Sequence, residues 1–274
     1  MPIALTHFAA RAGDHNDRAM QATPLLTTVL GERLRINAMV IGEPQPALSA
    51  NWDTELASAL PALLQMSAHY DRLLTAGQSP VTVLSRCAVA LATLPMVAKH
   101  RPDAVVVWFD AHADLNTPQN SSTGYLGGLA LAGPLGLWNS GLGSGLAEAN
   151  AILAGTRDID RPEQDVIDAG RIALIPVDED MAGNLLRTIA GRPVYVHVDC
   201  DVLEPGTVPT DYAVPEGMSL AQLSACARAL AHTEVVGLEI GELETAGVRH
   251  RLASDEPARL VTGALEPLLR ALAR

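Results

Sequence analysis

The stretch that decides the fold is Val105-Val106-Val107-Trp108-Phe109, followed at once by Asp110-Ala111-His112-Ala113-Asp114. The first five residues are apolar and mostly β-branched, which is typical of a strand buried on both faces of a sheet. The polar residues after it occupy alternate positions, and alternate side chains of an extended chain point the same way. We therefore expect Asp110, His112 and Asp114 to converge at the end of a buried strand.

Two carboxylates held this close repel each other unless a positive charge lies between them. A divalent cation would satisfy both, and a neutral imidazole could complete its set of ligands. The alternative is that Asp110 or Asp114 caps a helix while His112 only forms hydrogen bonds. For one such triplet alone, the helix cap is the better interpretation.

A second apolar run, Val194–Val198 with His197 inside it, also ends in carboxylates at alternate positions, Asp199 and Asp201. Cys200 faces the other way and is expected in the core. The carboxyl ends of parallel strands meet at one edge of a sheet, so two acidic strand ends favour a metal site over caps. Four carboxylates and one imidazole suit a hard ion such as Mn²⁺ better than Zn²⁺ held by thiolates.

A third run, Val235–Ile240, carries Glu239 within it, with Glu242 and Glu244 at its end. A carboxylate beside a metal cluster suits recognition of a cationic group, because carboxylate and guanidinium pair through two hydrogen bonds. Exposure at the surface is the alternative for Glu244, which is given no role.

Short β-branched runs alternate with helical patterns along the chain, which predicts an α/β fold with parallel strands and right-handed crossovers. The expected strands are 35–41, 81–84, 104–109, 151–155, 172–177, 194–198 and 235–240. The expected helices are one begun by Thr23-Pro24 and those over 55–76, 88–100, 162–169, 181–190, 219–231 and 257–273, with Ser219 as an N-cap. No repeat or linker interrupts the pattern, so residues 1–274 are expected to form a single domain.

The composition narrows the classes of partner and compartment. A net charge of −12, from 31 acidic and 19 basic residues, disfavours nucleic acid as a partner. The three cysteines form no C-x-x-C pair, and the N-terminus has no basic region before an apolar run, which favours the cytoplasm. Residues 115–147 carry no charge, but their glycines argue against a membrane span. We expect an active-site loop followed by a buried helix there.

With these segments in order, the sequence resembles the ureohydrolase family of arginases and agmatinases. The matching segments are Asp110–Pro118, Asp199–Asp201 and Gly237–Glu242, within about 81–243. The resemblance implies a three-layer α/β/α fold around a mostly parallel sheet, and a pair of Mn²⁺ ions. Asp110 and Asp199 would bridge the two ions, and the ligands that complete their shells would be His112, Asp114 and Asp201.

The resemblance also implies how a guanidine substrate would lie. Glu242 would face the guanidinium, and Asn116 would lie near the substrate carboxylate. Asp160, in the segment Arg157–Asp160, would face the α-amino group, with Glu163 assisting. Asp114 would then pass a proton to the leaving nitrogen.

Two segments depart from the family pattern. The first metal motif, Gly-Gly-Asp-His in the family, reads Leu84-Ser85-Arg86-Cys87 here, so Cys87 stands where a histidine ligand is expected. In the loop after the first acidic motif, Gly127 stands where arginases carry a histidine, and Tyr125 replaces a polar side chain. A soft thiolate matches Mn²⁺ poorly, so the metal position near Cys87 should be weak.

At both departures the sequence resembles a specialised branch of the family. That branch serves D-cycloserine biosynthesis and converts Nω-hydroxy-L-arginine to hydroxyurea and L-ornithine. An N-hydroxyguanidine is less basic than a guanidine, and Tyr125 or Cys87 could contact its added oxygen. Three alternatives stay open. They are an arginase- or agmatinase-type hydrolase of an unmodified guanidine, a catalytically silent paralogue that binds a ligand, and a metal-dependent deacetylase. A homo-oligomer is possible on this sequence.

Overall fold

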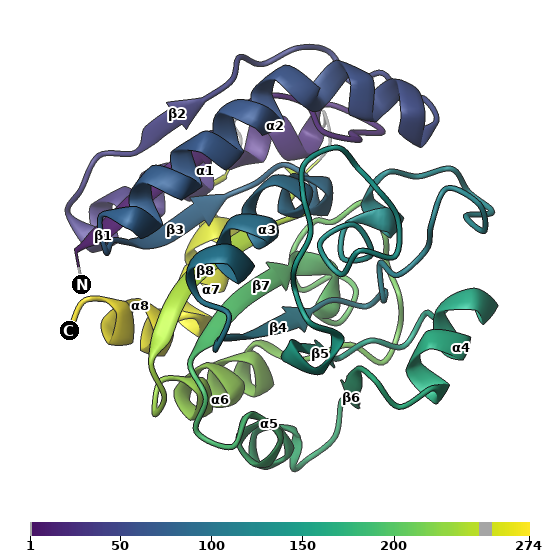
Figure 1. Ribbon diagram of the computed structural model, residues 1–274. Coiled ribbons are helices and arrows are strands. Elements are labelled where there is room, and N and C mark those ends of the chain that lie inside the picture. The colour runs from purple at the N-terminus through teal and green to yellow at the C-terminus, as the bar shows by residue number, and fades with distance from the viewer. Residues whose placement is uncertain (1, 247–253) are drawn as a thin grey trace.

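An eight-stranded sheet lies at the centre of the computed structural model, which describes residues 2–246 and 254–274 (Figure 1). Every pairing between its strands is parallel, and the strand order is β2-β1-β3-β8-β7-β4-β5-β6. The strands are β1 Ile3–Phe8, β2 Met39–Ile41, β3 Ser79–Val83, β4 Val105–Phe109, β5 Ala151–Ala154, β6 Ala173–Ile175, β7 Val194–Asp199 and β8 Val235–Gly241. The predicted α/β class with a parallel sheet is confirmed.

Helices cover both faces of this sheet, which makes the expected three layers. The helices are α1 Arg18–Leu34, α2 Trp52–Thr75, α3 Ala90–His100, α4 Arg161–Asp168, α5 Met181–Ile189, α6 Leu220–Leu230, α7 Glu256–Ala264 and α8 Glu266–Leu272. One core lies between the sheet and α1, α5, α6, α7 and α8. The other lies between the sheet and α2 and α3, with buried loop residues joining it.

The unbroken apolar run of β4 follows from this arrangement. Val105, Val107 and Phe109 pack into the first core, whereas Val106 and Trp108 pack into the second. All five are at most 1% exposed. A strand with helices on both faces has no solvent side, so the sequence shows no polar alternation until the strand ends.

The N-terminal third departs from the expected boundaries. β1 was not predicted, because buried polar residues such as Thr6 and His7 interrupt its apolar pattern. The helix expected to begin at Thr23-Pro24 begins at Arg18 instead. Pro24 has no N–H to give the carbonyl of Met20, and the Thr23 hydroxyl donates to that carbonyl at 3.0 Å.

The charge-free stretch 115–147 contains the expected loop, but the expected buried helix is wrong. Its regular structure is one turn of 3₁₀ helix, η2 Gly127–Leu129, followed by turns. Gly133, Pro134 and Gly136 prevent a longer helix. The end of the chain was also misread, because the helix expected over 257–273 is divided into α7 and α8.

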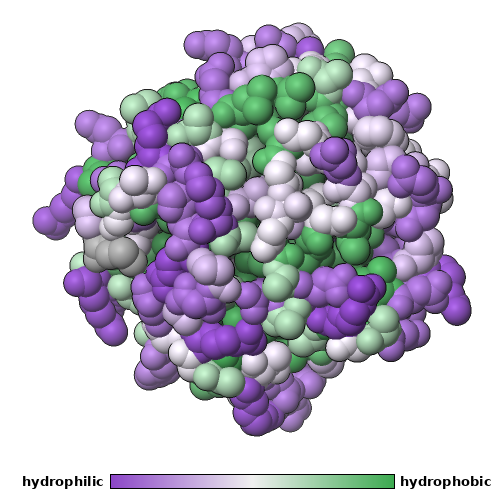
Figure 2. Space-filling model, viewed as in Figure 1, coloured by the Kyte–Doolittle hydropathy of each residue, from purple (hydrophilic) through white to green (hydrophobic). Residues whose placement is uncertain are grey.

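Burial explains why this stretch carries no charge. Its leucines at 126, 129 and 131 are fully buried. Figure 2 shows hydrophilic residues around the outline of the molecule and hydrophobic or neutral residues toward the middle, where the loop runs in the same view of Figure 1. No helix within the described ranges is both long and apolar enough to cross a membrane.

The start of α6 gives a stability test. As predicted, Ser219 is its N-cap: the Ser219 hydroxyl accepts from the Gln222 N–H at 3.2 Å, and Gln222 Oε1 accepts from the Ser219 N–H at 2.9 Å. We expect Ser219→Ala to lower the free energy of unfolding by about 1 kcal/mol in urea titrations. Ser224→Ala in the same helix is the control and should be neutral or slightly stabilising, because alanine favours helix. Equal losses in both variants would contradict a capping role.

Candidate metal centre and substrate pocket

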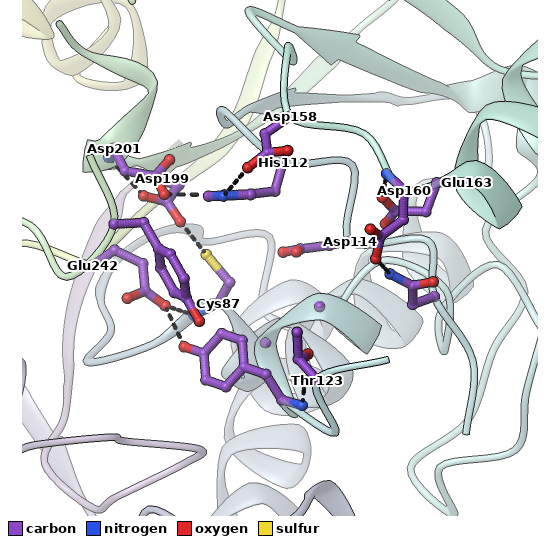
Figure 3. Close-up of a pocket in the computed structure, with 15 residues that line it drawn as sticks. Cys87, His112, Asp114, Thr123, Asp158, Asp160, Glu163, Asp199, Asp201 and Glu242 are labelled. Atoms are coloured by element: carbon purple, nitrogen blue, oxygen red, sulfur yellow. Dashed lines mark hydrogen bonds and ion pairs between the residues drawn. The ribbon is translucent and has the colours of Figure 1, made fainter. Parts of the chain in front are cut away.

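A pocket opens at the carboxyl edge of the sheet, where the loops after β3, β4, β7 and β8 meet (Figure 3). Its volume is about 150 Å³, which suits a small polar substrate. All of the predicted site residues except Asp110 line it, and Asp110 lies buried directly behind. The residues that line the pocket and were predicted are Cys87, His112, Asp114, Asn116, Tyr125, Asp160, Glu163, Asp199, Asp201 and Glu242.

One group within the pocket consists of Asp110, His112 and Asp201, whose potential ligand atoms lie within 4.8 Å of one another. His112 Nδ1 lies 3.3 Å from Asp110 Oδ1 and 3.1 Å from Asp201 Oδ2. Backbone N–H groups fix both carboxylates: that of His112 donates to Asp110 at 2.7 Å, and that of Ala111 to Asp201 at 3.1 Å. Two hard carboxylates and an imidazole are a donor set that fits a hard divalent cation.

A second group has different chemistry because it contains a thiol. Cys87, Asp199 and Glu242 bring their ligand atoms within 4.8 Å, and so do Cys87, Asp110 and His197. The Cys87 thiol donates to Asp199 Oδ2 at 3.2 Å. Burial raises the pKa of this thiol well above its ordinary value, and the charge of Asp199 adds to the effect. A neutral thiol is a weak ligand, so this half of the cluster fits a hard cation less well than the first.

The carboxylates oppose one another's charge. Burial, and then the charge of Asp201, raises the pKa of Asp110 to about 6. Burial likewise raises the pKa values of Asp114 and Asp199 well above their ordinary range, with like charges nearby adding to it. Burial also disfavours the charged form of Asp201, but the hydrogen bond from His112 holds its pKa below the ordinary value. Positive charge inside the cluster would relieve this repulsion.

Asp114 does not continue the alternation of β4. Its backbone is left-handed, with φ of 52°, and its carbonyl accepts the N–H groups of Leu131 and Ala132 at 3.1 and 3.0 Å. Its carboxylate points toward the middle of the pocket (Figure 3) but joins none of the three candidate ligand groups among the described residues. Glu242 also has a positive φ, 61°. Such strained conformations are retained where the surroundings impose them.

A buried histidine behind the cysteine was missed by the sequence reasoning. His197 Nε2 lies 3.1 Å from Cys87 Sγ, and His197 Nδ1 lies 2.7 Å from Glu239 Oε1. The His197 ring stacks on Trp108 with centroids 3.5 Å apart. Glu239 also accepts hydroxyl hydrogen bonds from Tyr195 and Thr93, both at 2.8 Å. The sequence did carry a signal for this contact, because His197 interrupts the apolar pattern of β7 and Glu239 interrupts that of β8.

Tyr125 and Gly127 depend on each other for space. A Cβ atom added to Gly127 would lie 2.3 Å from Tyr125 Cε1, so no larger residue fits at 127 while the tyrosine ring keeps its place. The Tyr125 hydroxyl donates to Glu242 Oε1 at 3.3 Å. Tyr212, which the sequence reasoning missed, completes an aromatic wall, with ring centroids 5.8 Å from Tyr125 and 5.1 Å from His112.

The far end of the pocket holds Asn116, Asp160 and Glu163. Asn116 Nδ2 donates to Asp160 Oδ2 at 2.8 Å, while Asn116 Oδ1 is buried without a hydrogen-bond partner in the described part of the chain. An unpaired buried acceptor calls for a donor from a ligand or water. Glu163 is already engaged, since it accepts the N–H groups of Asp160 and Leu115, both at 2.9 Å.

The remaining carboxylates of the third strand have structural partners. Glu239 lies below the pocket in the network with His197. Glu244, for which exposure was considered, is 3% exposed and binds Arg86 Nη2 at 2.9 Å and Arg18 Nε at 2.8 Å. Cys200 is 1% exposed in the core, as expected.

Comparison with known proteins agrees with this geometry. A sequence model of the arginase family matches residues 29–255. The chain is 38% identical to the Nω-hydroxy-L-arginine amidinohydrolase of Streptomyces lavendulae over 241 residues, 88% of each chain. It is 29% identical to the arginase of Glaciozyma antarctica over 188 residues, 61% of this chain and 54% of that one.

Among solved structures, arginase from Bacillus subtilis superposes with a TM-score of 0.82 at 20% identity over 98% of each chain, which shows a shared fold. The family match covers most of the sequence, from the end of α1 to the start of α7. On this evidence the chain belongs to the arginase family.

Proposed function

We propose that this protein hydrolyses the guanidine C–N bond of Nω-hydroxy-L-arginine, giving hydroxyurea and L-ornithine. The observation that carries the proposal is that Tyr125 and Cys87 contact the same oxygen of Glu242 in one pocket. The Tyr125 hydroxyl and the Cys87 backbone N–H both donate to Glu242 Oε1, at 3.3 and 3.0 Å. The Streptomyces lavendulae relative, 38% identical, is an amidinohydrolase named for this substrate.

The donor set supports manganese as the metal. We propose that Asp110, His112, Asp114, Asp199 and Asp201 hold Mn²⁺, and that one ion position lies near Cys87. Bound divalent ions would supply Lewis-acid activation of water. Because the thiol replaces an imidazole there, that position should bind the ion more weakly.

The other residues would orient the substrate. Glu242 would accept a guanidine N–H at one end, while Asn116 and Asp160 would contact the amino-acid end, with Glu163 holding Asp160 through its backbone. Water oxygen would add to the guanidine carbon and give up a proton to Asp114, and the bond from that carbon to the ornithine nitrogen would break. Asp114 would deliver the proton that the departing nitrogen needs.

Two alternatives considered from the sequence are distinguished from this proposal by the activity assay described below. An arginase- or agmatinase-type activity would use an unmodified guanidine, and a silent paralogue would bind ligand without turnover. The deacetylase alternative loses its support, since the family match is to arginases.

The three cysteines are all buried and unpaired, in keeping with a reducing cytoplasm, where a role in antibiotic biosynthesis would be carried out.

The substrate proposal is tested by a panel assayed with Mn²⁺: Nω-hydroxy-L-arginine, L-arginine, agmatine, guanidinobutyrate and formiminoglutamate. We expect the hydroxylated substrate to give the highest kcat/KM, with hydroxyurea and ornithine formed in equal amounts. A higher kcat/KM for L-arginine would replace this proposal with ordinary arginase activity, and binding without product would favour the silent paralogue.

The metal proposal is tested at Asp199. The Asp199→Asn variant removes a charge that two cations would share, so we expect turnover to fall by at least about 10³-fold while the fold is kept. Metal analysis should show reduced Mn²⁺ content, and circular dichroism should match that of the wild type. Asp178→Asn, on the surface before α5, is the control. Near-normal activity of Asp199→Asn would mean that the cluster is misassigned.

The weak metal position is tested at Cys87. We expect Cys87→His to raise Mn²⁺ content toward two ions per chain and to shift kcat/KM toward L-arginine, because imidazole is a better ligand than a buried thiol. His197 Nε2 lies only 3.1 Å from Sγ, so a companion variant with His197→Ser gives the new ring space. Cys87→Ser, which adds no nitrogen, is the control. Unchanged metal content in both histidine variants would make Cys87 a packing residue.

A further inference from the structure

Arg86 is a fully buried arginine one residue before Cys87, and it does not line the pocket. Its guanidinium forms four ion pairs, of which the longest joins Nη1 to Asp211 Oδ2 at 3.5 Å. Nη1 lies 2.6 Å from Glu242 Oε2, Nη2 lies 2.9 Å from Glu244 Oε1, and Nε lies 3.2 Å from Asp14 Oδ1. A cation with no exposed surface is thus fixed directly behind the carboxylate that faces the pocket.

Glu242 has little hydrogen-bonding capacity left as a result. Arg86 occupies Oε2, while Oε1 accepts the Cys87 N–H and the Tyr125 hydroxyl. A carboxylate that binds a guanidinium through two parallel hydrogen bonds needs both oxygens. In this protein an internal guanidinium already binds Oε2 and two other donors bind Oε1, so Glu242 has little capacity left for a bidentate bond to an incoming guanidinium.

The charge of Glu242 is also compensated from within. Burial is the largest influence on the Arg86 guanidinium and lowers its pKa, but the charges of Glu242 and Asp14 and the hydrogen bond to Glu242 together raise the pKa above its ordinary value. A cationic substrate at Glu242 would therefore place a second guanidinium on a carboxylate that Arg86 already pairs with. Two like charges in this position disfavour binding, whereas an uncharged group with an N–H meets no such penalty.

We propose that Arg86, by holding Glu242 in an internal ion pair, makes the pocket prefer a weakly basic N-hydroxyguanidine over the guanidinium of arginine. This inference rests on the function proposed above and adds a reason for its substrate class. Arg86 acts through Glu242 and is a positioning residue. The N-hydroxy group withdraws electrons from the guanidine, so the neutral form is accessible and can donate to Glu242 without adding a cation.

The competing explanation is that Arg86 only neutralises buried acids. Asp14 is fully buried beside it, and burial, partly offset by Arg86, raises the pKa of Asp14 to about 6. Glu244 has a second partner in Arg18. A variant at Arg86 alone leaves the buried acids without their cation, and it can lose stability for reasons unrelated to the substrate. The test variant therefore removes one buried acid along with the cation.

The test is the double variant Arg86→Gln with Asp14→Asn, which leaves the buried net charge unchanged and frees Glu242 Oε2. Asp14→Asn alone is the matched control, because it keeps the ion pair between Arg86 and Glu242. We expect the control to keep the wild-type ratio of kcat/KM for Nω-hydroxy-L-arginine over L-arginine. The double variant should lower that ratio on the order of tenfold or more, mainly through a lower KM for L-arginine.

Inhibition of the wild type gives a second measurement, which can then be repeated on the double variant. Guanidinium chloride at millimolar concentration, with sodium chloride as the ionic-strength control, and hydroxyurea are compared as competitive inhibitors of similar size. We expect the cation to bind no more tightly than neutral hydroxyurea in the wild type, and to gain affinity in the double variant.

The outcomes separate the two proposals. A wild type that releases hydroxyurea, together with a folded double variant that keeps the wild-type ratio, would leave the activity standing and reduce Arg86 to charge neutralisation. Much tighter inhibition of the wild type by guanidinium than by hydroxyurea would overturn the inference as well. Absence of any turnover by the wild type with Mn²⁺ would instead remove the proposed function.

Discussion

The mutual repulsion of buried carboxylates at one edge of a parallel sheet is the constraint on which this structure depends. Asp110, Asp114, Asp199, Asp201 and Glu242 are each at most 5% exposed. Burying one unpaired carboxylate is already costly, and a cluster of them is tolerated only where cations or hydrogen-bond donors compensate. Two features compensate the buried negative charge in this structure. The carboxylates line a pocket whose donors fit a cation, and the Arg86 guanidinium lies behind Glu242.

These two answers divide the site into unlike halves. Around His112 the donors are hard and their backbone contacts are fixed, so the fit to a hard divalent ion is good. Around Cys87 the donors include a thiol, and the neighbouring Glu242 is already paired with Arg86. The half around Cys87 therefore offers weaker ligands than the half around His112.

The residues that follow strand ends could be predicted from the sequence, whereas the contacts between side chains of different strands and loops could not. The acidic motifs after β4 and β7 were predictable, because a run buried on both faces has to end where polar residues begin. The tertiary partners were not: His197 looks like an ordinary interruption of a strand until its distance to Cys87 is known. The single turn at η2 was missed because leucines and glycines in a charge-free run fit a buried helix and a packed loop equally well.

The close approach of Tyr125 to Gly127 and of Cys87 to His197 has a consequence for evolution. Each pair shares one small volume, so a change at one member alters what the other can be. We expect positions 125 and 127, and positions 87 and 197, to co-vary among relatives. A single substitution between cysteine and histidine at position 87 would then leave either a steric clash or a cavity at the paired position 197. That epistasis would make the two forms discrete groups in a family tree rather than a continuum.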